Sequence, residues 1–462
     1  MLRKLQATIV DLRNFQVHHL RTLSKAGEDS LAVTLSKSRE FLRSMELDVE
    51  NLKKLGAVNR SITSNMLKLQ SYVQERIHTL QNPSDCSRAP KLRCLLDNLH
   101  GVAAGIHDVL WCFVAALRMG RTVILDSSQW HYAPGKEWAL TFLLTAGPSC
   151  SNAQMNNTID KGYPGYDSSP KERSQIVDLP ATIVETLVGN HGNPYAWWYG
   201  QIVSYAFRLQ DSALQKIKEL KAAQGYVHPI VGVHIRQTDK SREAAYHSVE
   251  EYMSHVEEYY ARLSLTTHVK EKRVFVATDE PKVVSEIREK FPDYLVIHNN
   301  ASSSQAHDLR AREKSSSLFG VISDIQLLAE SDFLVCTMSS GFCRVAYELM
   351  QARHPDASLM AASLDVEYFY AYVPFPPRRT LQANTPSFAS ELGWSKPGVL
   401  IERPGTFALL EEAKLKKNAD GFSTGRIASN AAIGRTTVFP VFKTMRTYRV
   451  ANYSAFATSP LS

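Results

Sequence analysis

The stretch Val231-Gly-Val-His-Ile-Arg-Gln-Thr-Asp-Lys240 decides the fold of the second half of this chain. Its first part, together with Ile230, is an apolar run over residues 230–235 that is typical of a buried strand. Polar residues then alternate along the chain, and side chains of one parity project from the same face of an extended segment. The stretch therefore predicts a buried strand whose carboxyl end carries a set of polar side chains: His234, Arg236, Thr238 and Lys240.

The same alternation of strand and helix continues after this strand. Further strands are expected at 273–278, 295–298 and 333–337, and helices at 249–263, 281–291, 317–330 and 341–353. This order predicts a doubly wound parallel sheet, in which ligands bind outside the carboxyl ends of the strands. The sequence has no GxGxxG after a strand and no GxxxxGK[ST], so a phosphate must be held in another way.

Three other regions surround this sheet. Alternating patterns between Leu92 and Gly225 predict a second, open α/β region. The residues before Pro83 predict helices with a coiled-coil spacing, which would form a hairpin or a dimerisation stalk. The alternative is that these helices are an outer layer of the catalytic domain. The apolar residues with this spacing, called the seam, are Leu5, Ile9, Leu12, Ile62, Met66, Leu69, Val73 and Leu80. Short β-like pieces after the Pro-rich segment 374–377 predict a small barrel.

Composition limits the class of protein. The 462 residues are 44% hydrophobic and 21% charged, as in ordinary globular proteins, and the formal charge of +7 is not gathered in a stripe for nucleic acid. The apolar run Val109 to Leu117 is shorter than the roughly 20 residues of a membrane span. The even number of cysteines without metal-ligand spacing fits disulfides or buried reduced thiols, so the cellular compartment stays open at this point.

Three residues are candidates for binding a nucleotide. Arg236 can hold two phosphate oxygens, or it can pair with Asp239. Ser340 stands at the expected start of a helix, where free backbone N–H groups bind phosphate, although most such caps bind nothing. Asp324 can accept two hydrogens from a guanine edge, or it can be a solvated residue of its helix.

An ordered set of motifs resembles the metazoan core α1,6-fucosyltransferases of N-glycans. The motifs extend from about Cys86 to Lys443 and include His234-Ile-Arg-Gln-Thr-Asp-Lys240, Ala277-Thr-Asp-Glu280, Gly320-Val-Ile-Ser-Asp-Ile325, Asp332-Phe-Leu-Val-Cys336 and Cys343-Arg-Val-Ala-Tyr-Glu-Leu-Met350. The resemblance implies an α/β fold with a GT-B-like catalytic region, coiled-coil stem helices and a C-terminal SH3-like β-barrel. The expected division is stem 1–82, open α/β subdomain 83–225, Rossmann-type subdomain 226–378, SH3-like domain 390–446 and tail 447–462.

The resemblance also implies an activity and its residues. The family transfers fucose from GDP-fucose, with inversion and without a metal or other cofactor, to the 6-hydroxyl of the innermost GlcNAc of complex-type N-glycans. Donor binding is implied for His234, Arg236, Asp324 and Ser340, catalysis for Glu243, Arg236 and Lys240, and acceptor contact for Asp279, Glu280 and Asp365. The family is dimeric, lies in the Golgi lumen behind a type II membrane anchor and has disulfides that correspond to Cys86–Cys150, Cys94–Cys112 and Cys336–Cys343.

Several positions depart from the family. Gln237 stands where the family has a second arginine, and the segment between Lys240 and Glu243 is one residue shorter. Asn418-Ala419 replaces a His-Trp in the SH3-like region. These changes support an alternative, an inactive or acceptor-altered relative that acts as a dimeric glycan- or protein-binding module. A cytosolic nucleotide-sugar enzyme, with all six thiols reduced, is a third hypothesis.

Overall fold

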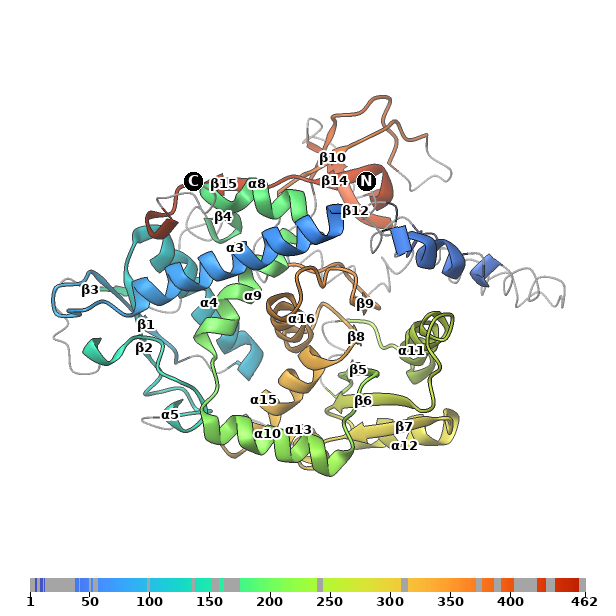
Figure 1. Cartoon of the computed structure of the whole chain (residues 1–462), viewed down its shortest axis with the longest axis horizontal. Helices are drawn as coiled ribbons and strands as arrows, with labels where there is room; N and C mark the ends of the chain where they lie inside the picture. Colours follow the sequence, from blue (N-terminus) through green and yellow to red (C-terminus); the bar gives the residue numbers. More distant parts are fainter. Residues whose placement is uncertain are drawn as a thin grey trace.

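The computed structural model consists of two parallel α/β regions, an antiparallel sheet and a C-terminal segment that returns to the first region (Figure 1). It describes residues 5, 9–10, 12, 38–40, 42–49, 51–52, 57–97, 100–134, 138–150, 158–161, 175–238, 244–308, 315–370, 376–385, 392–402, 422–428 and 437–456. The predicted α/β class with parallel sheets is confirmed.

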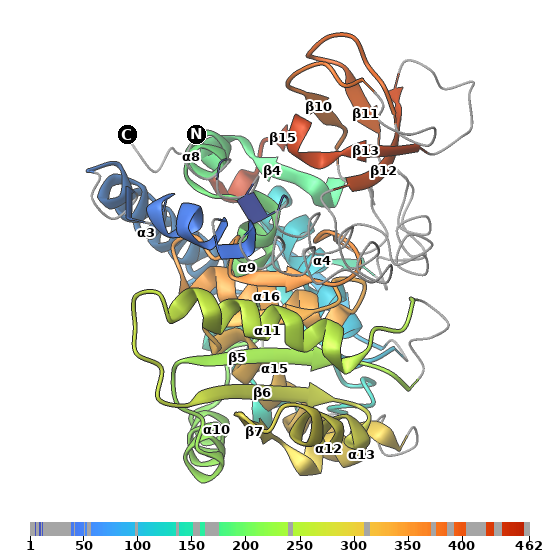
Figure 2. The ribbon, with the colours of Figure 1, turned by 90° about the vertical axis from the view of Figure 1, so that its right-hand side faces the viewer.

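The second α/β region is a five-stranded parallel sheet in the order β7-β6-β5-β8-β9. Its strands are β5 (Ile230–Ile235), β6 (Lys272–Thr278), β7 (Tyr294–His298), β8 (Phe333–Cys336) and β9 (Ala361–Ser363). The helices are α11 (Val249–Leu263), α12 (Pro281–Lys290), α13 (Asn300–His307), α15 (Ser315–Glu330) and α16 (Gly341–Arg353). Figure 2 shows α11 beside this sheet, with α15 on its other side. Alternate residues of β5 face the two helical layers: Val231, Val233 and Ile235 pack with α11 and α12, whereas Ile230 joins the core that contains α15 and α16.

The first α/β region is a three-stranded parallel sheet in the order β2-β1-β3. Its elements are β1 (Lys91–Leu95), β2 (Thr122–Asp126), β3 (Thr158–Lys161), α4 (Val102–Met119), α5 (Trp138–Thr141), α8 (Ala181–Asn190), α9 (Pro194–Ala206) and α10 (Asp211–Gln224). Within the described residues, α4 alone has the length and apolar composition of a membrane span, but most of it is buried in the protein core. The aromatic helix α9 is almost wholly buried.

The two regions share one hydrophobic core because α9 packs closely against α16. At the point of contact, a Cβ atom added to Gly200 of α9 would lie 2.1 Å from the carbonyl oxygen of Glu348 of α16. Only glycine allows the two helix backbones to approach so closely. Apolar residues of α4, α9, α15 and α16 therefore form a continuous core, which fixes the two regions relative to each other.

The helix α3 (Ala57–Gln81) corrects the interpretation of the predicted coiled-coil seam. Met66, Leu69 and Val73 are buried in the core that the two α/β regions share, where α3 contacts α8 and α9. The seam of this helix therefore faces its own domain, as in the alternative interpretation, because the same spacing suits any apolar partner. Earlier in the chain, Ile9 packs with Leu42 and Val49, which is the kind of contact that a helical hairpin makes. A coiled-coil stem stays a prediction.

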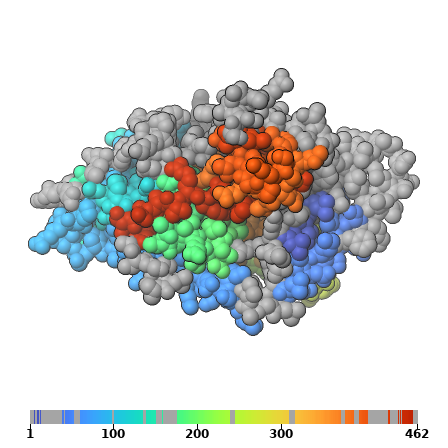
Figure 3. Space-filling view, turned by 90° about the horizontal axis from the view of Figure 1, so that it is seen from above, coloured from blue at the N-terminus to red at the C-terminus, as the bar shows by residue number. Residues whose placement is uncertain are grey.

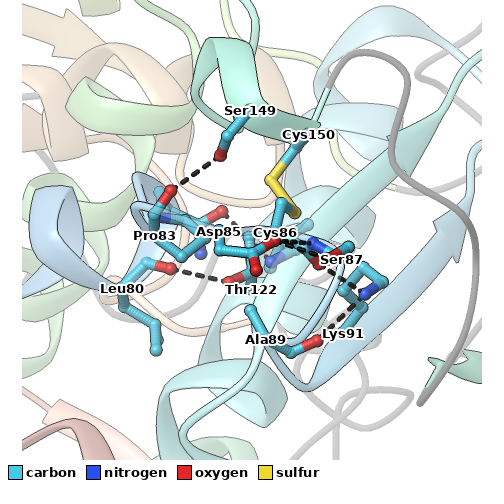
Figure 4. The surroundings of a disulfide bond; sticks show 12 residues. Leu80, Pro83, Asp85, Cys86, Ser87, Ala89, Lys91, Thr122, Ser149 and Cys150 are labelled. Atoms are coloured by element: carbon cyan, nitrogen blue, oxygen red, sulfur yellow. Dashed lines mark hydrogen bonds between the residues drawn. A yellow bond between two sulfur atoms is a disulfide. The ribbon is translucent and has the colours of Figure 1, made fainter.

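The three predicted disulfide pairs are all present. Cys86–Cys150 and Cys94–Cys112 are in the first α/β region, and Cys336–Cys343 joins β8 to the first turn of α16. Around the first pair, Ser149 Oγ donates to the Pro83 carbonyl (2.7 Å) and the buried Lys91 Nζ donates to the Cys86 carbonyl (2.7 Å) (Figure 4). The segment between α3 and β1 is thus joined to Ser149 and Cys150 by a disulfide and a hydrogen bond.

The C-terminal domain contains a five-stranded antiparallel sheet in the order β13-β12-β11-β10-β14. Its strands are β10 (Arg378–Thr380), β11 (Leu400–Glu402), β12 (Phe422–Ile427), β13 (Thr437–Pro440) and β14 (Thr444–Arg446), and Trp394, Ile401 and Phe439 form a small core. The domain begins earlier than the expected residue 390, because β10 pairs with both β11 and β14. An SH3-like closure of this sheet stays a prediction, and the altered position Asn418-Ala419 lies outside the described residues.

Residues 449–456, within the predicted tail 447–462, pack against the first α/β region. The strand β15 (Arg449–Ala451) pairs in parallel with β4 (Asp178–Pro180), and the turn η6 (Ser454–Phe456) packs against α3 and α4. Tyr453 and Phe456 are buried beside Trp198 of α9. Seen from above, the red C-terminal segment lies along the green α8 region (Figure 3). Apolar burial, together with hydrogen bonds to β4, holds the segment in place.

Candidate active site

The carboxyl edge of the five-stranded sheet gathers most of the predicted site residues. His234 is the second-last residue of β5, Asp279 follows β6, and Ser340 follows β8 at the start of α16. Because β5 pairs in parallel with both β6 and β8, these three strand ends lie side by side. The sequence prediction of a common polar edge therefore agrees with the arrangement of the strands.

His234 is held between the sheet and α16. It is buried, and its imidazole stacks on the ring of Phe342, with the ring centres 4.5 Å apart and the planes inclined by 6°. Phe342 belongs to the first turn of α16, so the stacking also fixes the end of β5 against the start of that helix. The stacking therefore fixes the position of the His234 imidazole at the carboxyl edge of the sheet.

Arg236 lies beside the carboxylate of Asp279. Its Nε atom is 3.9 Å from Asp279 Oδ2, and its side chain is partly exposed. Asp279 also accepts hydrogen bonds from the backbone N–H of Gln237 (2.8 Å) and from Thr238 Oγ1 (2.6 Å). This buried carboxylate, which was predicted to contact the acceptor, therefore fixes the chain after β5 and lies beside the partly exposed guanidinium.

Gln237, where the family has a second arginine, takes part in a neutral contact. Its Nε2 atom donates to the hydroxyl of the exposed Tyr246 over 3.1 Å. The amide brings no positive charge to the edge, so Arg236 supplies the guanidinium at this strand end. Lys240 and Glu243, the predicted catalytic residues, lie outside the described residues, which stop at Thr238 and resume at Ala244.

The loop between β8 and α16 is held from both sides. Asp365 Oδ1 accepts from the backbone N–H of Ser339 (3.3 Å), and Ser363 Oγ accepts from that of Met338 (3.0 Å). Arg344 Nη1 donates to the carbonyl oxygens of Met338 (2.8 Å) and Ser339 (3.3 Å). Asp365 was predicted to be near the acceptor or in its polar network, and with an exposed fraction of 1% it belongs to the network that shapes this loop.

Ser340 is the N-terminal residue that caps α16 by position, but its side chain makes no capping hydrogen bond. Its buried Oγ has no hydrogen-bond partner among the described residues. The first N–H groups of a helix lack intrahelical acceptors and carry a partial positive charge. A hydroxyl and helix N–H groups left without acceptors, behind a rigid loop, are suited to binding phosphate oxygens.

The first turn of α4 approaches the start of α16 from the other α/β region. A Cβ atom added to Gly341 would lie 3.4 Å from the Cβ of Ala103 and 3.9 Å from His107 Nδ1. The sequence analysis missed this convergence of two helix starts, because it depends on how the two regions pack. It also missed Arg344, although a cation within the apolar run Phe342-Cys343-Arg344-Val345-Ala346 was a visible signal.

Asp324 lies on α15, with only 5% of its surface exposed. Burial raises the pKa of Asp324 to about 7, against the opposing effect of hydrogen bonds from Ser302 and Asn299. A carboxyl group with such a perturbed pKa is typical of a functional site. Glu280, by contrast, caps α12 by accepting from the backbone N–H of Lys282 (3.2 Å), and one of its oxygens is 3.6 Å from His307 Nδ1.

The edge thus combines a partly exposed guanidinium, an uncapped helix start and a buried carboxylate on a Rossmann-type sheet. Among the described residues, no three His, Cys, Asp or Glu side chains are grouped so that they could hold a metal ion. This set of groups defines the class of the protein as an α/β protein whose sheet edge is a candidate site for an anionic ligand.

Comparison with known proteins identifies the family. A family described as "Alpha-(1,6)-fucosyltransferase N- and catalytic domains" matches residues 1–369. The alpha-(1,6)-fucosyltransferase of Drosophila melanogaster is 34% identical over 463 residues, which cover 96% of this chain and 72% of that protein. The Caenorhabditis elegans alpha-(1,6)-fucosyltransferase is 33% identical over 312 residues, which cover 64% of this chain and 55% of that protein. The chain therefore belongs to the α-(1,6)-fucosyltransferase family, whose members are glycosyltransferases.

Two solved structures are remotely similar. The NodZ α-1,6-fucosyltransferase soaked with GDP-fucose is 16% identical, with a TM-score of 0.36, and the match covers 56% of this chain and 92% of NodZ. POFUT1 in complex with GDP-fucose is 11% identical, with a TM-score of 0.32, and the match covers 60% of this chain and 99% of POFUT1.

Proposed function

We propose that this chain transfers fucose from GDP-fucose to the 6-hydroxyl of the innermost GlcNAc of complex-type N-glycans, with inversion and without a metal ion. The observation that carries this proposal is that Arg236 and the buried hydroxyl of Ser340, at the start of α16, follow the neighbouring strands β5 and β8 at one sheet edge. Membership of the α-(1,6)-fucosyltransferase family supports the reaction type.

The reaction needs one base and a site that accepts the leaving group. In the proposed step, the carboxylate of Glu243 takes the proton of the acceptor 6-hydroxyl while its oxygen attacks the anomeric carbon of fucose. The bond from that carbon to the diphosphate breaks, and GDP leaves with the electron pair. Arg236 and the start of α16 stabilise the charge that develops on the diphosphate. Lys240 and Glu280 are proposed to lie near the acceptor, and His234 and Asp324 to contact guanosine.

We place this activity in the Golgi lumen, in a homodimer. The support is chemical: all six cysteines are paired, and disulfides persist in oxidising compartments. Dimerisation rests on the resemblance alone. The proposed acceptor is an N-glycoprotein.

The test is mass spectrometry of a GlcNAc-terminated biantennary glycopeptide after incubation with GDP-fucose and EDTA. Wild type should add one deoxyhexose to the innermost GlcNAc, and Arg236→Ala should lower the rate by roughly a hundredfold or more, as does removal of a group that stabilises developing charge. Arg288→Ala is the matched control, because Arg288 is exposed near the C-terminal end of α12 and its side chain contacts Val296 and His298 of β7. Addition by Arg236→Ala at the wild-type rate would contradict the assigned role.

The alternative function, a binding module without turnover, is favoured by one observation, the neutral Gln237–Tyr246 contact in place of a second arginine. It predicts that the wild-type chain binds GDP but adds no fucose to any tested glycopeptide. Calorimetry with GDP alongside the mass spectrometry therefore separates the two functions. A requirement for added divalent cation would overturn metal independence alone.

A further inference from the structure

Asn299 and Ser302, at the start of α13, reach across to the carboxylate of Asp324 on α15. Ser302 Oγ donates to Asp324 Oδ2 over 2.6 Å, and Asn299 Nδ2 donates to Oδ1 over 3.3 Å. Each carboxylate oxygen thus receives one hydrogen bond from a neutral donor. Ser302 and Asp324 are both buried, with 5% of each residue exposed.

The local structure fixes this arrangement. The side-chain oxygen of Asn299 accepts from the backbone N–H of Ser302 (3.3 Å) as the cap of α13, so its amide nitrogen is turned toward Asp324. Gly320 lies one helical turn before Asp324, and an added Cβ atom there would be 3.1 Å from both Cβ and Oγ of Ser302. The absence of a side chain at Gly320 lets α13 approach α15 closely enough for Ser302 to reach the carboxylate.

The pattern of donors decides what the carboxylate can bind. An ionised carboxylate is acceptor-only, and each oxygen has two lone-pair positions. With one position on each oxygen filled, Asp324 keeps one acceptor position on each. The Watson–Crick edge of guanine presents two adjacent N–H donors, whereas that of adenine presents a donor next to an acceptor. Adenine would match Asp324 only if the carboxyl group of Asp324 were protonated.

Burial works against the ionised form, and the two neutral donors work for it. Desolvation raises the pKa of Asp324 to about 7, while the hydrogen bonds from Ser302 and Asn299 lower it. Among the described residues, no charged side chain contributes to this shift. The balance between the two forms of the carboxyl group therefore depends on these two donors.

We propose that Asn299 and Ser302 are positioning residues that hold Asp324 as a paired hydrogen-bond acceptor and thereby make the site select guanine over adenine nucleotides. This inference rests on the proposed function, because it places the base of the donor nucleotide at Asp324. It adds to that function two residues that touch no nucleotide and act through Asp324.

The test is isothermal calorimetry of the full chain with GDP and with ADP. We expect wild type to bind GDP roughly a hundredfold more tightly than ADP, since a site built around a hydrogen bond rejects a base that cannot make it. Ser302→Ala should lower this ratio roughly tenfold, chiefly by weakening GDP. Asn299→Asp keeps the helix cap and replaces the donor with an acceptor, so it should lower the ratio at least as much.

Ser303→Ala is the matched control. Ser303 is the next residue of α13, is equally buried, and its hydroxyl has no hydrogen-bond partner among the described residues. It should leave the GDP-to-ADP ratio unchanged. If Ser302→Ala does not fold, the measurement on Asn299→Asp decides the proposal.

The outcomes separate the inference from the proposed function. Equal weakening of GDP and ADP, or an unchanged ratio in both variants, would overturn the specificity role while leaving the nucleotide site intact. Wild-type binding of GDP and ADP with equal affinity would overturn it as well. If wild type binds neither nucleotide, the proposed function itself is wrong.

Discussion

Replacing the buried carboxyl of Asp324 by an amide should change how the stability of the protein depends on pH. The folded-state pKa of Asp324 is about 7, above its ordinary value of 3.8, because burial disfavours the charge. Below pH 3.8 the group is protonated in both states, so its favourable contribution to stability is fully present. As pH rises, the carboxyl group ionises in the unfolded chain first, so this contribution decreases with pH. It stops decreasing once the pH passes about 7, where the group ionises in the folded protein as well.

The size of this effect follows from the separation of the two pKa values. One pKa unit corresponds to about 1.4 kcal/mol, and between about pH 5 and about pH 7 the group should cost about 2 kcal/mol of the free energy of unfolding. Asp324→Asn has a similar shape and does not titrate, so it lacks this loss. The difference in free energy of unfolding between variant and wild type should therefore increase by about 2 kcal/mol over this range.

Thermal unfolding of both proteins across this pH range is the assay, with the melting temperature as the readout. A change of 2 kcal/mol corresponds to roughly 4 °C for a large domain. Saturating GDP should reduce the pH dependence of wild type, since N–H donors of a bound base would stabilise the ionised carboxylate. Parallel pH profiles of variant and wild type would refute the raised pKa, and a GDP-insensitive profile would refute the contact with the base.

Two further predictions test the C-terminal segment and the altered strand end. Phe456→Ala should lower the free energy of unfolding by about 3 to 5 kcal/mol, because the ring is buried against Tyr72 and Trp198. The control Val450→Ala, at an exposed position, should change the melting temperature little. Similar melting temperatures of the two variants would contradict the packing of Phe456. Gln237→Arg should tighten GDP binding roughly threefold to tenfold at low salt, and added salt should abolish this gain. Calorimetry at two salt concentrations is the measurement. Equal affinities of the variant and wild type at low salt would contradict a position near the diphosphate.

Four strands of the five-stranded sheet could be predicted closely because their signals are local, whereas the three-residue strand β9 was not predicted. The strand expected at 230–235 and the helix expected at 249–263 have the same bounds in the structure. Their apolar residues are consecutive in the buried strand and helically spaced in the amphipathic helix, and Ser248 with Glu251 forms a capping box. Such patterns depend on neighbours within a few positions, so they do not require knowledge of the tertiary structure.

The partner of an apolar face is not encoded in its spacing. The residues of α3 repeat as a coiled-coil seam would, yet they pack on α8 and α9 of the same domain. In the same way, the segment around Tyr453 and Phe456 is short and has little pattern, and its burial follows from docking onto Trp198. In both cases the sequence specifies that a surface is apolar, and the chain topology specifies what covers it.

The same distinction applies to the site. The positions of His234, Arg236 and Ser340 at the carboxyl edge of the sheet could be predicted from sequence, because they lie at or just after strand ends. Asn299 and Ser302 could not, because a neutral donor acquires a role only when another helix brings a carboxylate to it, here through the close approach at Gly320. Family membership therefore accounts for the type of reaction, while the groups that tune the nucleotide site lie in contacts between helices. Substitutions at such positions can change nucleotide selectivity without altering any residue of the recognisable motifs.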